Sequence, residues 1–76
     1  MEWKERIEVR ADVLTGKPVV KGTRLSVDFV LGLLSEGWTE EEILEDYPGL
    51  AVEDIRACLA YASFTLAAEK IYAIAV

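Results

Sequence analysis

The sequence predicts a small, mainly helical domain in which three helices follow a short β-containing N-terminal arm. Apolar residues recur at helical spacing from Val27 onward, and charged residues alternate with other residues before Ala11. A chain of 76 residues, of which 53% are hydrophobic, can form one modest core and is too apolar to be disordered. We therefore expect one domain over residues 1–76. Its expected parts are an arm at 1–25, a helical bundle at 26–70 and an apolar C-terminal tail at 71–76.

The arm is predicted from charged residues that recur at every second position. Between residues 2 and 10 every even position is charged, and the odd positions include Trp3, Ile7 and Val9, which is typical of a half-buried strand. A turn and a β-branched pair within residues 15–20 predict a second short strand. Such a small hairpin leaves unpaired edges, which favours dimerisation through this region.

The first two helices are predicted from their caps. Ser26 can cap a helix over residues 27–36, and Gly37 can end it. Thr39 and Glu42 form a capping-box pattern for a short second helix that runs to Asp46, before a Pro-Gly pair.

The third helix is predicted over residues 52–70, where no helix breaker occurs. One face at helical spacing is expected to pack on the first two helices: Ile55, Leu59, Ala62 and Leu66. A second apolar stripe exceeds what one small bundle can cover. This surplus stripe, with one residue of the arm and one of the tail, supplies the candidate partner-binding residues Trp3, Tyr61, Phe64, Ala68, Ile71 and Tyr72.

The charge is divided unevenly along the chain. Residues 1–24 hold six basic and four acidic side chains, whereas the remainder holds two basic and ten acidic ones. Phosphate neutralisation needs clustered cations, so any DNA contact is expected in the N-terminal third. The acidic remainder suits a basic protein partner. The candidate nucleic-acid-binding residues are Lys17, Lys21, Gly22, Thr23 and Arg24.

Two interpretations of Gly22-Thr23-Arg24 stay open. Gly22 can allow a close backbone approach to a ligand, with Thr23 and Arg24 contacting phosphate or base. Alternatively, Gly22 supplies a positive φ for a turn and Arg24 pairs with Asp28, four residues on. Insertion of the third helix into the DNA major groove is disfavoured, because its start carries two acids against one arginine.

No catalytic, metal or cofactor site is predicted. The chain has no histidine, and Cys58 lies among apolar residues as a small core side chain. The acids at 40–46 are interpreted as a solvated helix face. With a single cysteine and neither a signal-like segment nor a membrane-length apolar run, we expect a cytoplasmic protein that is not an enzyme and has no membrane partner.

Several motifs, in the same order, resemble one bacterial family. They are Gly16-Lys17-Pro18-Val19-Val20-Lys21-Gly22-Thr23-Arg24, then Glu36-Gly37-Trp38-Thr39-Glu40-Glu41-Glu42-Ile43-Leu44, Tyr47-Pro48-Gly49-Leu50 and Asp54-Ile55-Arg56-Ala57-Cys58-Leu59-Ala60-Tyr61-Ala62. Across about residues 7–65 the chain resembles the domain of unknown function 433 family. It departs from the family pattern at Ser26, where proline is usual, and at Ala51, where a threonine N-cap is usual.

The resemblance implies a homeodomain-like, helix-turn-helix fold and an antitoxin paired with a small toxin similar to PIN-type ribonucleases. Our leading hypothesis is therefore an antitoxin-like protein of a type II toxin-antitoxin pair. It is expected to form a homodimer and to bind the toxin, with operator DNA as a second ligand. Carboxylates such as Glu69 or the apolar tail would cover the ribonuclease site. A stand-alone DNA-binding transcriptional regulator and a structural oligomerisation module stay open as alternatives.

Overall fold

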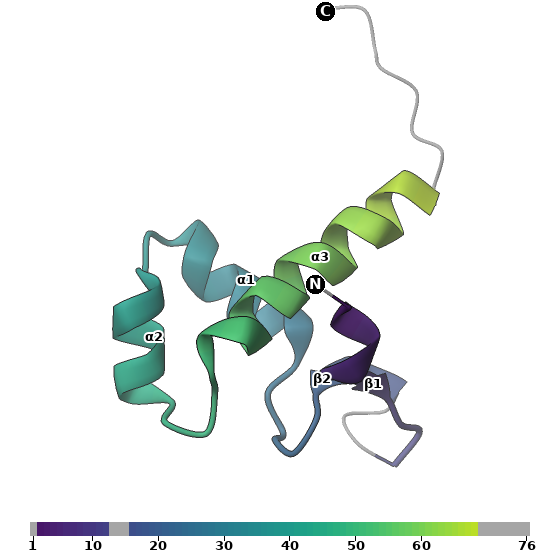
Figure 1. The fold of residues 1–76 in the computed structure, drawn as a ribbon, viewed down its shortest axis with the longest axis horizontal. Helices are drawn as coiled ribbons and strands as arrows, with labels where there is room; N and C mark the ends of the chain where they lie inside the picture. Colours follow the sequence, from purple (N-terminus) through teal and green to yellow (C-terminus); the bar gives the residue numbers. More distant parts are fainter. Residues whose placement is uncertain (1, 13–15, 69–76) are drawn as a thin grey trace, which may run out of the picture.

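The three predicted helices are all present in the computed structural model, which describes residues 2–12 and 16–68 (Figure 1). The elements, in chain order, are a 3-10 helix η1 (Trp3–Glu5), strands β1 (Ile7–Val9) and β2 (Pro18–Val20), and helices α1 (Val27–Ser35), α2 (Glu40–Asp46) and α3 (Val52–Ala68). The protein is therefore mainly helical, with a small two-stranded sheet near its N-terminus. The predicted tail, with Ile71 and Tyr72, lies outside the described residues.

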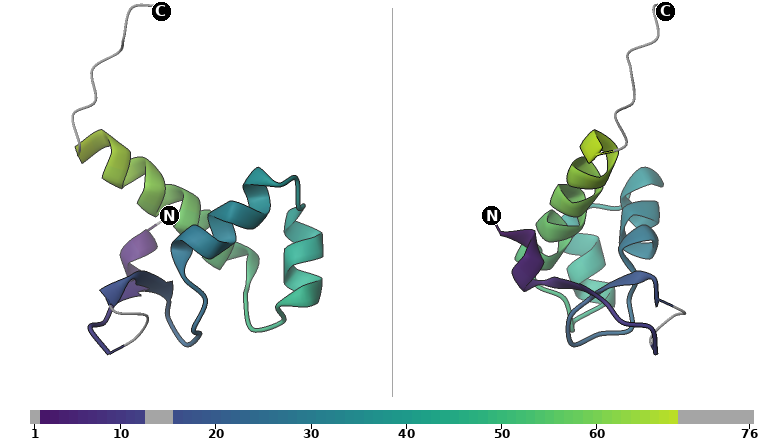
Figure 2. Two further views of the ribbon diagram at one scale, coloured as in Figure 1. Left: turned by 180° about the vertical axis from the view of Figure 1, so that it is seen from behind. Right: turned by 90° about the vertical axis from the view of Figure 1, so that its right-hand side faces the viewer.

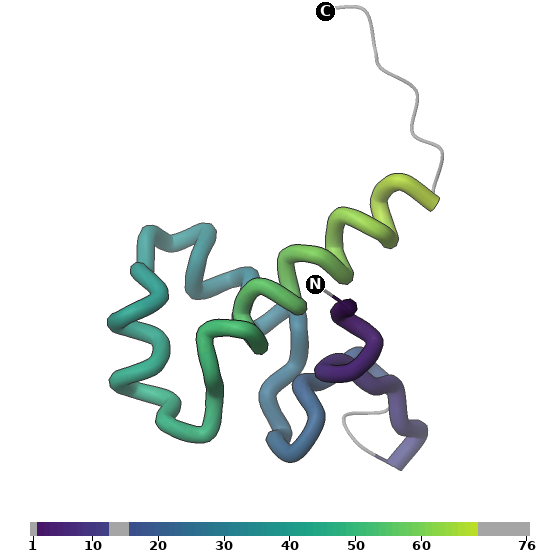
Figure 3. The backbone as a smooth tube through the Cα atoms, viewed as in Figure 1, coloured from purple at the N-terminus to yellow at the C-terminus, as the bar shows by residue number. Residues whose placement is uncertain are grey.

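Helix α3 is the central element of the fold. It contacts α1, α2, η1 and β1. Seen from behind, α1 crosses in front of α3 and α2 stands to one side, while η1 and the strands lie at the opposite end of the molecule (Figure 2). The N-terminal half of α3 thus packs against the other elements on one face, and its C-terminal half extends beyond them (Figure 3).

The arm differs from its prediction. A strand was expected through Trp3, but η1 forms there, with the Arg6 N–H donating to the Trp3 carbonyl at 2.9 Å. The physical reason is the Trp3 ring, which packs edge-on against Tyr61 of α3 with ring centroids 5.1 Å apart. Burying an aromatic ring on α3 outweighs the local preference for an extended chain. Val9 is 59% exposed, so the predicted alternation fails there too.

The two strands pair antiparallel over three residues, with Ile7 opposite Val20 and Val9 opposite Pro18. Val19 and Val20 are both fully buried. The free edge of β2 is partly covered by the chain itself, because Val19 forms a bridge with Ser26 and the Val20 N–H donates to the Leu25 carbonyl at 3.0 Å. The sheet therefore offers less edge to a second chain than the sequence suggested.

The helix caps confirm their predictions. The Ser26 hydroxyl accepts from the Phe29 N–H at 3.2 Å at the start of α1. Thr39 and Glu42 form the complete capping box of α2, with the Glu42 carboxylate accepting from the Thr39 N–H at 2.8 Å. Gly37 adopts a φ of +96° just after α1, a conformation that favours glycine.

The core lies where the three helices meet β2. Its largest fully buried side chains are Val19, Val20, Val30, Ile43, Ile55 and Cys58. The predicted packing face of α3 is only partly right: Ile55 is buried, but Leu59 and Leu66 are 48% and 56% exposed. Because η1 and β1 also pack on α3, the buried face is turned toward Asp54, Ala57 and Cys58. None of the described helices has the length and apolar character needed to cross a membrane.

Candidate protein-interaction surfaces

The three predicted basic residues have acidic neighbours and do not form a purely basic patch. The Lys17 ammonium lies 3.4 Å from the Asp28 carboxylate, and both side chains are more than half exposed. The Ser26 hydroxyl and then Lys17 lower the pKa of Asp28. Lys21 instead lines a hollow of about 420 Å³ with Glu5, Arg6 and Asp54. Lys17 and Lys21 therefore face different parts of the surface, and each has an acid beside it.

Arg24 does not make the expected ion pair, because Asp28 is paired with Lys17. Arg24 is exposed and lies near a different acid, Asp12. The hydrogen bond from Arg10 lowers the pKa of Asp12 most, and the positive charge of Arg24 lowers it further. The Asp12 carboxylate also accepts from Arg10 at 2.9 Å, so carboxylates offset the positive charge on this part of the arm.

Gly22 and Thr23 have structural roles in the turn after β2. Gly22 has a φ of +81°, and a Cβ placed there would meet nothing within 4 Å, so the requirement for glycine is conformational. The Thr23 hydroxyl donates to the Val20 carbonyl at 2.8 Å and accepts from the Leu25 N–H at 3.0 Å. These observations favour the turn interpretation for both residues, since the Thr23 O–H is already used within the chain.

The partly buried ion pair between the arm and α3 was not anticipated. Asp54 is only 8% exposed, and its carboxylate accepts from the Arg6 guanidinium at 2.9 Å and from the Ala51 N–H at 2.8 Å. Asp54 thereby supplies the acidic half of a capping box, whereas the hydroxyl half that the usual threonine at position 51 would supply is absent. The sequence contained a signal for the contact with Ala51, because the carboxylate of an acid at the third position of a helix often accepts from the N–H of the residue just before the helix.

The start of α3 is a poor surface for duplex DNA. Asp54 was expected to be exposed there but is buried, whereas Glu53 beside it is exposed. The one arginine of this helix, Arg56, lies 3.7 Å from Glu40 of α2. A helix that presents a carboxylate and a neutralised arginine gains little from phosphate, so its electrostatics do not favour insertion into the major groove.

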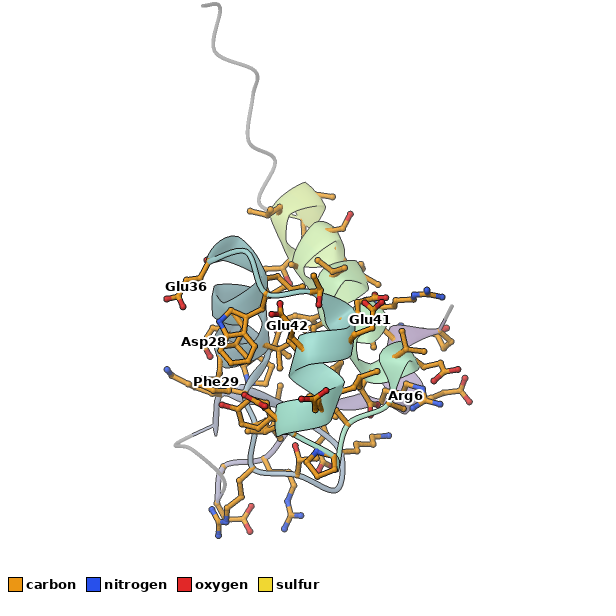
Figure 4. All side chains as sticks on the ribbon, turned by 90° about the vertical axis from the view of Figure 1, so that its left-hand side faces the viewer. Arg6, Asp28, Phe29, Glu36, Glu41 and Glu42 are labelled. Atoms are coloured by element: carbon orange, nitrogen blue, oxygen red, sulfur yellow. The ribbon has the colours of Figure 1, made fainter. Side chains whose placement is uncertain are left out.

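An acidic surface lies beside Trp38. A hollow of about 370 Å³, the acidic hollow below, is lined by Glu36, Gly37, Trp38, Glu42, Glu45 and Asp46. The turn at Gly37 brings the end of α1 against α2, and Figure 4 shows Glu36 and Glu42 on this side of the molecule. Glu42 is engaged in the capping box. Glu45 and Asp46, three and four residues after Glu42, lie on the same face of α2 and make that face acidic.

The second distinctive surface is apolar and belongs to the C-terminal half of α3. Phe64 and Leu66 are both more than half exposed there. Trp3 covers one flank, with its ring centroid 5.4 Å from that of Phe64. On the other flank α1 and α3 enclose an apolar hollow of about 410 Å³. Trp3, a candidate partner-binding residue, is therefore half-buried within its own chain, whereas Phe64 and Ala68 stay exposed.

Cys58 has the properties expected of a core residue. It is fully buried, and burial, followed by the negative charge of Asp54, raises the pKa of its thiol to about 12. A thiol that stays protonated at neutral pH is a poor nucleophile and a poor metal ligand.

Comparison with known proteins identifies the family of this chain. The family described as "Protein of unknown function (DUF433)" matches residues 7–62. The chain belongs to this family. The matched region begins at β1 and ends within α3, so it includes the sheet, α1, α2 and the acidic hollow, but neither Trp3 nor Phe64.

Two similar proteins extend this result. The "Uncharacterized protein y4eO" of Sinorhizobium fredii (strain NBRC 101917 / NGR234) is 39% identical over 59 residues, which are 78% of this chain and 27% of that protein. A crystal structure of a DUF433 member protein from Anabaena variabilis ATCC 29413 has a TM-score of 0.73 and 29% identity, over 76% of this chain and 57% of that one. Both relatives are thus considerably longer than the matched region.

Proposed function

We propose that this chain is an antitoxin-like protein of a type II toxin-antitoxin pair, which binds a basic ribonuclease toxin through its acidic hollow. The observation that carries the proposal is the arrangement of Glu36, Glu45 and Asp46 around Trp38. Carboxylates around an aromatic face are suited to a lysine or arginine side chain, which can pair with the acids and lie over the indole. The resemblance to antitoxins that partner PIN-like ribonucleases supplies the class of partner.

The negative charge of the chain favours binding of a basic partner over catalysis of a reaction. The chain carries a net charge of −6, and α2 alone has five acids in seven residues. A basic partner is therefore attracted from a distance and oriented toward α2, which raises the association rate and makes it dependent on salt. Neutralisation then needs no catalysis, because an acidic protein seated on a basic active site blocks access of RNA. On this proposal the chain is not an enzyme.

The test is a pull-down with two matched variants. The first neutralises the acidic hollow by Glu36→Gln, Glu45→Gln and Asp46→Asn. The control removes the same three charges elsewhere, by Glu2→Gln, Glu8→Gln and Glu53→Gln. Each tagged protein is expressed in the source organism, co-purified small proteins are identified by mass spectrometry, and ribonuclease activity is measured with and without the antitoxin.

The wild-type chain and the control should retain and inhibit a stoichiometric ribonuclease, and the hollow variant should lose at least tenfold in affinity. If both variants retain the ribonuclease equally, the contact with the toxin lies elsewhere on the chain. Absence of any ribonuclease partner, while its gene is expressed, would leave the stand-alone regulator or the oligomerisation module as the better account.

A second function, DNA binding, is favoured by one observation. Lys21 and Arg24 lie on a single exposed turn, and neither forms an ion pair within the described part of the chain. The homeodomain-like arrangement implied by the resemblance belongs to this second proposal. Charge reversal of both residues should weaken binding to the upstream operator duplex at least tenfold, measured by fluorescence anisotropy, and should reduce the salt slope by about two. Reversal of Arg56, which is paired with Glu40 of α2, serves as the control.

A further inference from the structure

The apolar hollow beside α3 has a defined shape and position. It lies between α1 and the C-terminal half of α3, and we call it the α1–α3 groove. Its apolar lining is Pro18, Val27, Leu31, Tyr61, Ala62 and Leu66. Lys17 and Asp28 lie at its rim. Leu59 and Phe64, both about half exposed, are each three residues along α3 from a lining residue and flank the groove.

The groove continues a face that is buried elsewhere in the helix. Ile55 and Cys58 are fully buried, and Ala62 and Leu66 follow them at helical spacing. Past this point α3 extends beyond α1, so the same face loses its partner (Figures 1 and 3). From Ala57 to Ala68 the helix has no charged side chain at all. A continuous neutral face on such an acidic chain is typical of a surface that another polypeptide covers.

The charged side chains at the rim of the α1–α3 groove indicate which kind of molecule binds in it. A two-fold interface brings the same patch of each copy together, so it is stable only where the patch is complementary to itself. The rim carries one cation and one anion, Lys17 and Asp28, which are already 3.4 Å apart and largely exposed. Two copies meeting there can exchange these partners. The acidic hollow could not serve this purpose, because two copies would place carboxylates against carboxylates.

We propose that a second copy of this chain docks in the α1–α3 groove, giving a two-fold dimer in which α3 helices pack together and Lys17 pairs with Asp28 across the interface. This places self-association on α3 and not on the sheet, where Val19 and Ser26 already cover part of the edge of β2. The interface is separate from the acidic hollow, so the dimer can form with or without a toxin.

The exposed area sets the strength of this dimer. At about 200 Å² for a large side chain, Leu59, Phe64 and Leu66 together offer about 300 Å², and the rest of the groove lining adds less than this. The sum stays below the ~800 Å² per partner of a standard stable interface. We therefore expect reversible dimerisation with a dissociation constant of roughly 10–500 µM, and not a permanent dimer.

The test is sedimentation equilibrium of the full chain alone, from about 5 µM to about 1 mM, a range that spans the expected dissociation constant. Leu66→Glu should weaken the dimer at least tenfold, because it buries a carboxylate from each copy. Val9→Glu is the control, since Val9 is equally exposed but lies on β1. Both sites are exposed, so both variants should keep the circular dichroism spectrum and Tm of the wild type.

A charge swap tests the rim. Lys17→Glu alone and Asp28→Lys alone should each weaken the dimer, and the double variant should restore it, since the cross pairs re-form with exchanged signs. A chain that stays monomeric at 1 mM, or one that Leu66→Glu and Val9→Glu affect equally, would overturn the proposal. So would nuclear Overhauser contacts from residues 71–76 to Leu31 in the monomer, which would make the chain's own tail the occupant. The variant with a neutralised acidic hollow should dimerise normally, so the failure of one proposal is distinguishable from the failure of the other.

Discussion

Replacing Asp54 with alanine tests the ion pair that joins the arm to α3. The Asp54 carboxylate has two partners, the Arg6 guanidinium at 2.9 Å and the Ala51 N–H at 2.8 Å. Alanine would remove both acceptors at once. The arm would lose its only described side-chain hydrogen bond to α3, and the first turn of α3 would lose a capping interaction.

The magnitude follows from the two interactions taken separately. Loss of the cap at Ala51 costs about 1 kcal/mol of the free energy of unfolding. A hydrogen bond to a charged group contributes about 1.5–3 kcal/mol when buried. Because the Arg6 side chain is 39% exposed and can turn partly to water, we take about 1–2 kcal/mol for the ion pair. The expected total is about 2–3 kcal/mol, or a fall in Tm of roughly 10–20 °C for a domain of this size.

The assay is urea unfolding followed by far-ultraviolet circular dichroism and by tryptophan fluorescence. Glu53→Ala is the matched control, since it removes an exposed acid from the same turn of α3 and should cost no more than about 0.5 kcal/mol. A double-mutant cycle of Arg6→Gln with Asp54→Ala should give a coupling energy of about 1 kcal/mol. If the two single alanine variants prove equally stable, Asp54 does not anchor the arm and our account of it is wrong.

Three further predictions follow from the arm and the core. Trp3→Ala should destabilise the fold by about 2 kcal/mol, roughly half the cost for a fully buried tryptophan, and Trp3→Phe should recover much of this in urea unfolding. Gly22→Ala should cost about 1 kcal/mol by differential scanning calorimetry, because the φ of +81° is strained for alanine although the added Cβ meets no atom; no loss would contradict a positive φ. Cys58 should resist iodoacetamide in the native protein at neutral pH and react once urea unfolds the chain, since its thiol pKa is raised to about 12; rapid native labelling, read by mass spectrometry, would show that the site is open.

The helices could be predicted because their signals are local. The hydroxyl of Ser26 bonds an N–H three residues away, and Thr39 and Glu42 bond one another across the same interval. Such contacts form whenever the segment becomes helical, whatever packs against it. The same locality explains why the end of α1 at Gly37 was anticipated.

The candidate sites were less predictable, because exposure is a property of the whole fold. Leu59 and Leu66 have the same spacing as Ile55, yet only Ile55 is buried. Packing of η1 and β1 turns the buried face of α3 toward Asp54 and Ala57 and away from Leu59, and Leu66 lies in the C-terminal half, which extends past the other elements. The acidic hollow required the end of α1 to approach α2, which no spacing within either helix specifies. The ion pair between Lys17 and Asp28 is another contact between separate segments, because the two residues are eleven positions apart in the chain.

The sequence alone specifies three helices, their caps, a β-containing start and an uneven distribution of charge, because each depends on residues within one or two turns of each other. Tertiary contacts settle which side chains remain available to a partner. The sequence shows Arg6 only as one of the basic side chains of residues 1–24, and the fold pairs it with Asp54, 48 positions away. Trp3 was assigned to a strand, but its ring packs on α3. Burial of an aromatic ring or a charge depends on every element that surrounds it, so it follows only from the packed chain.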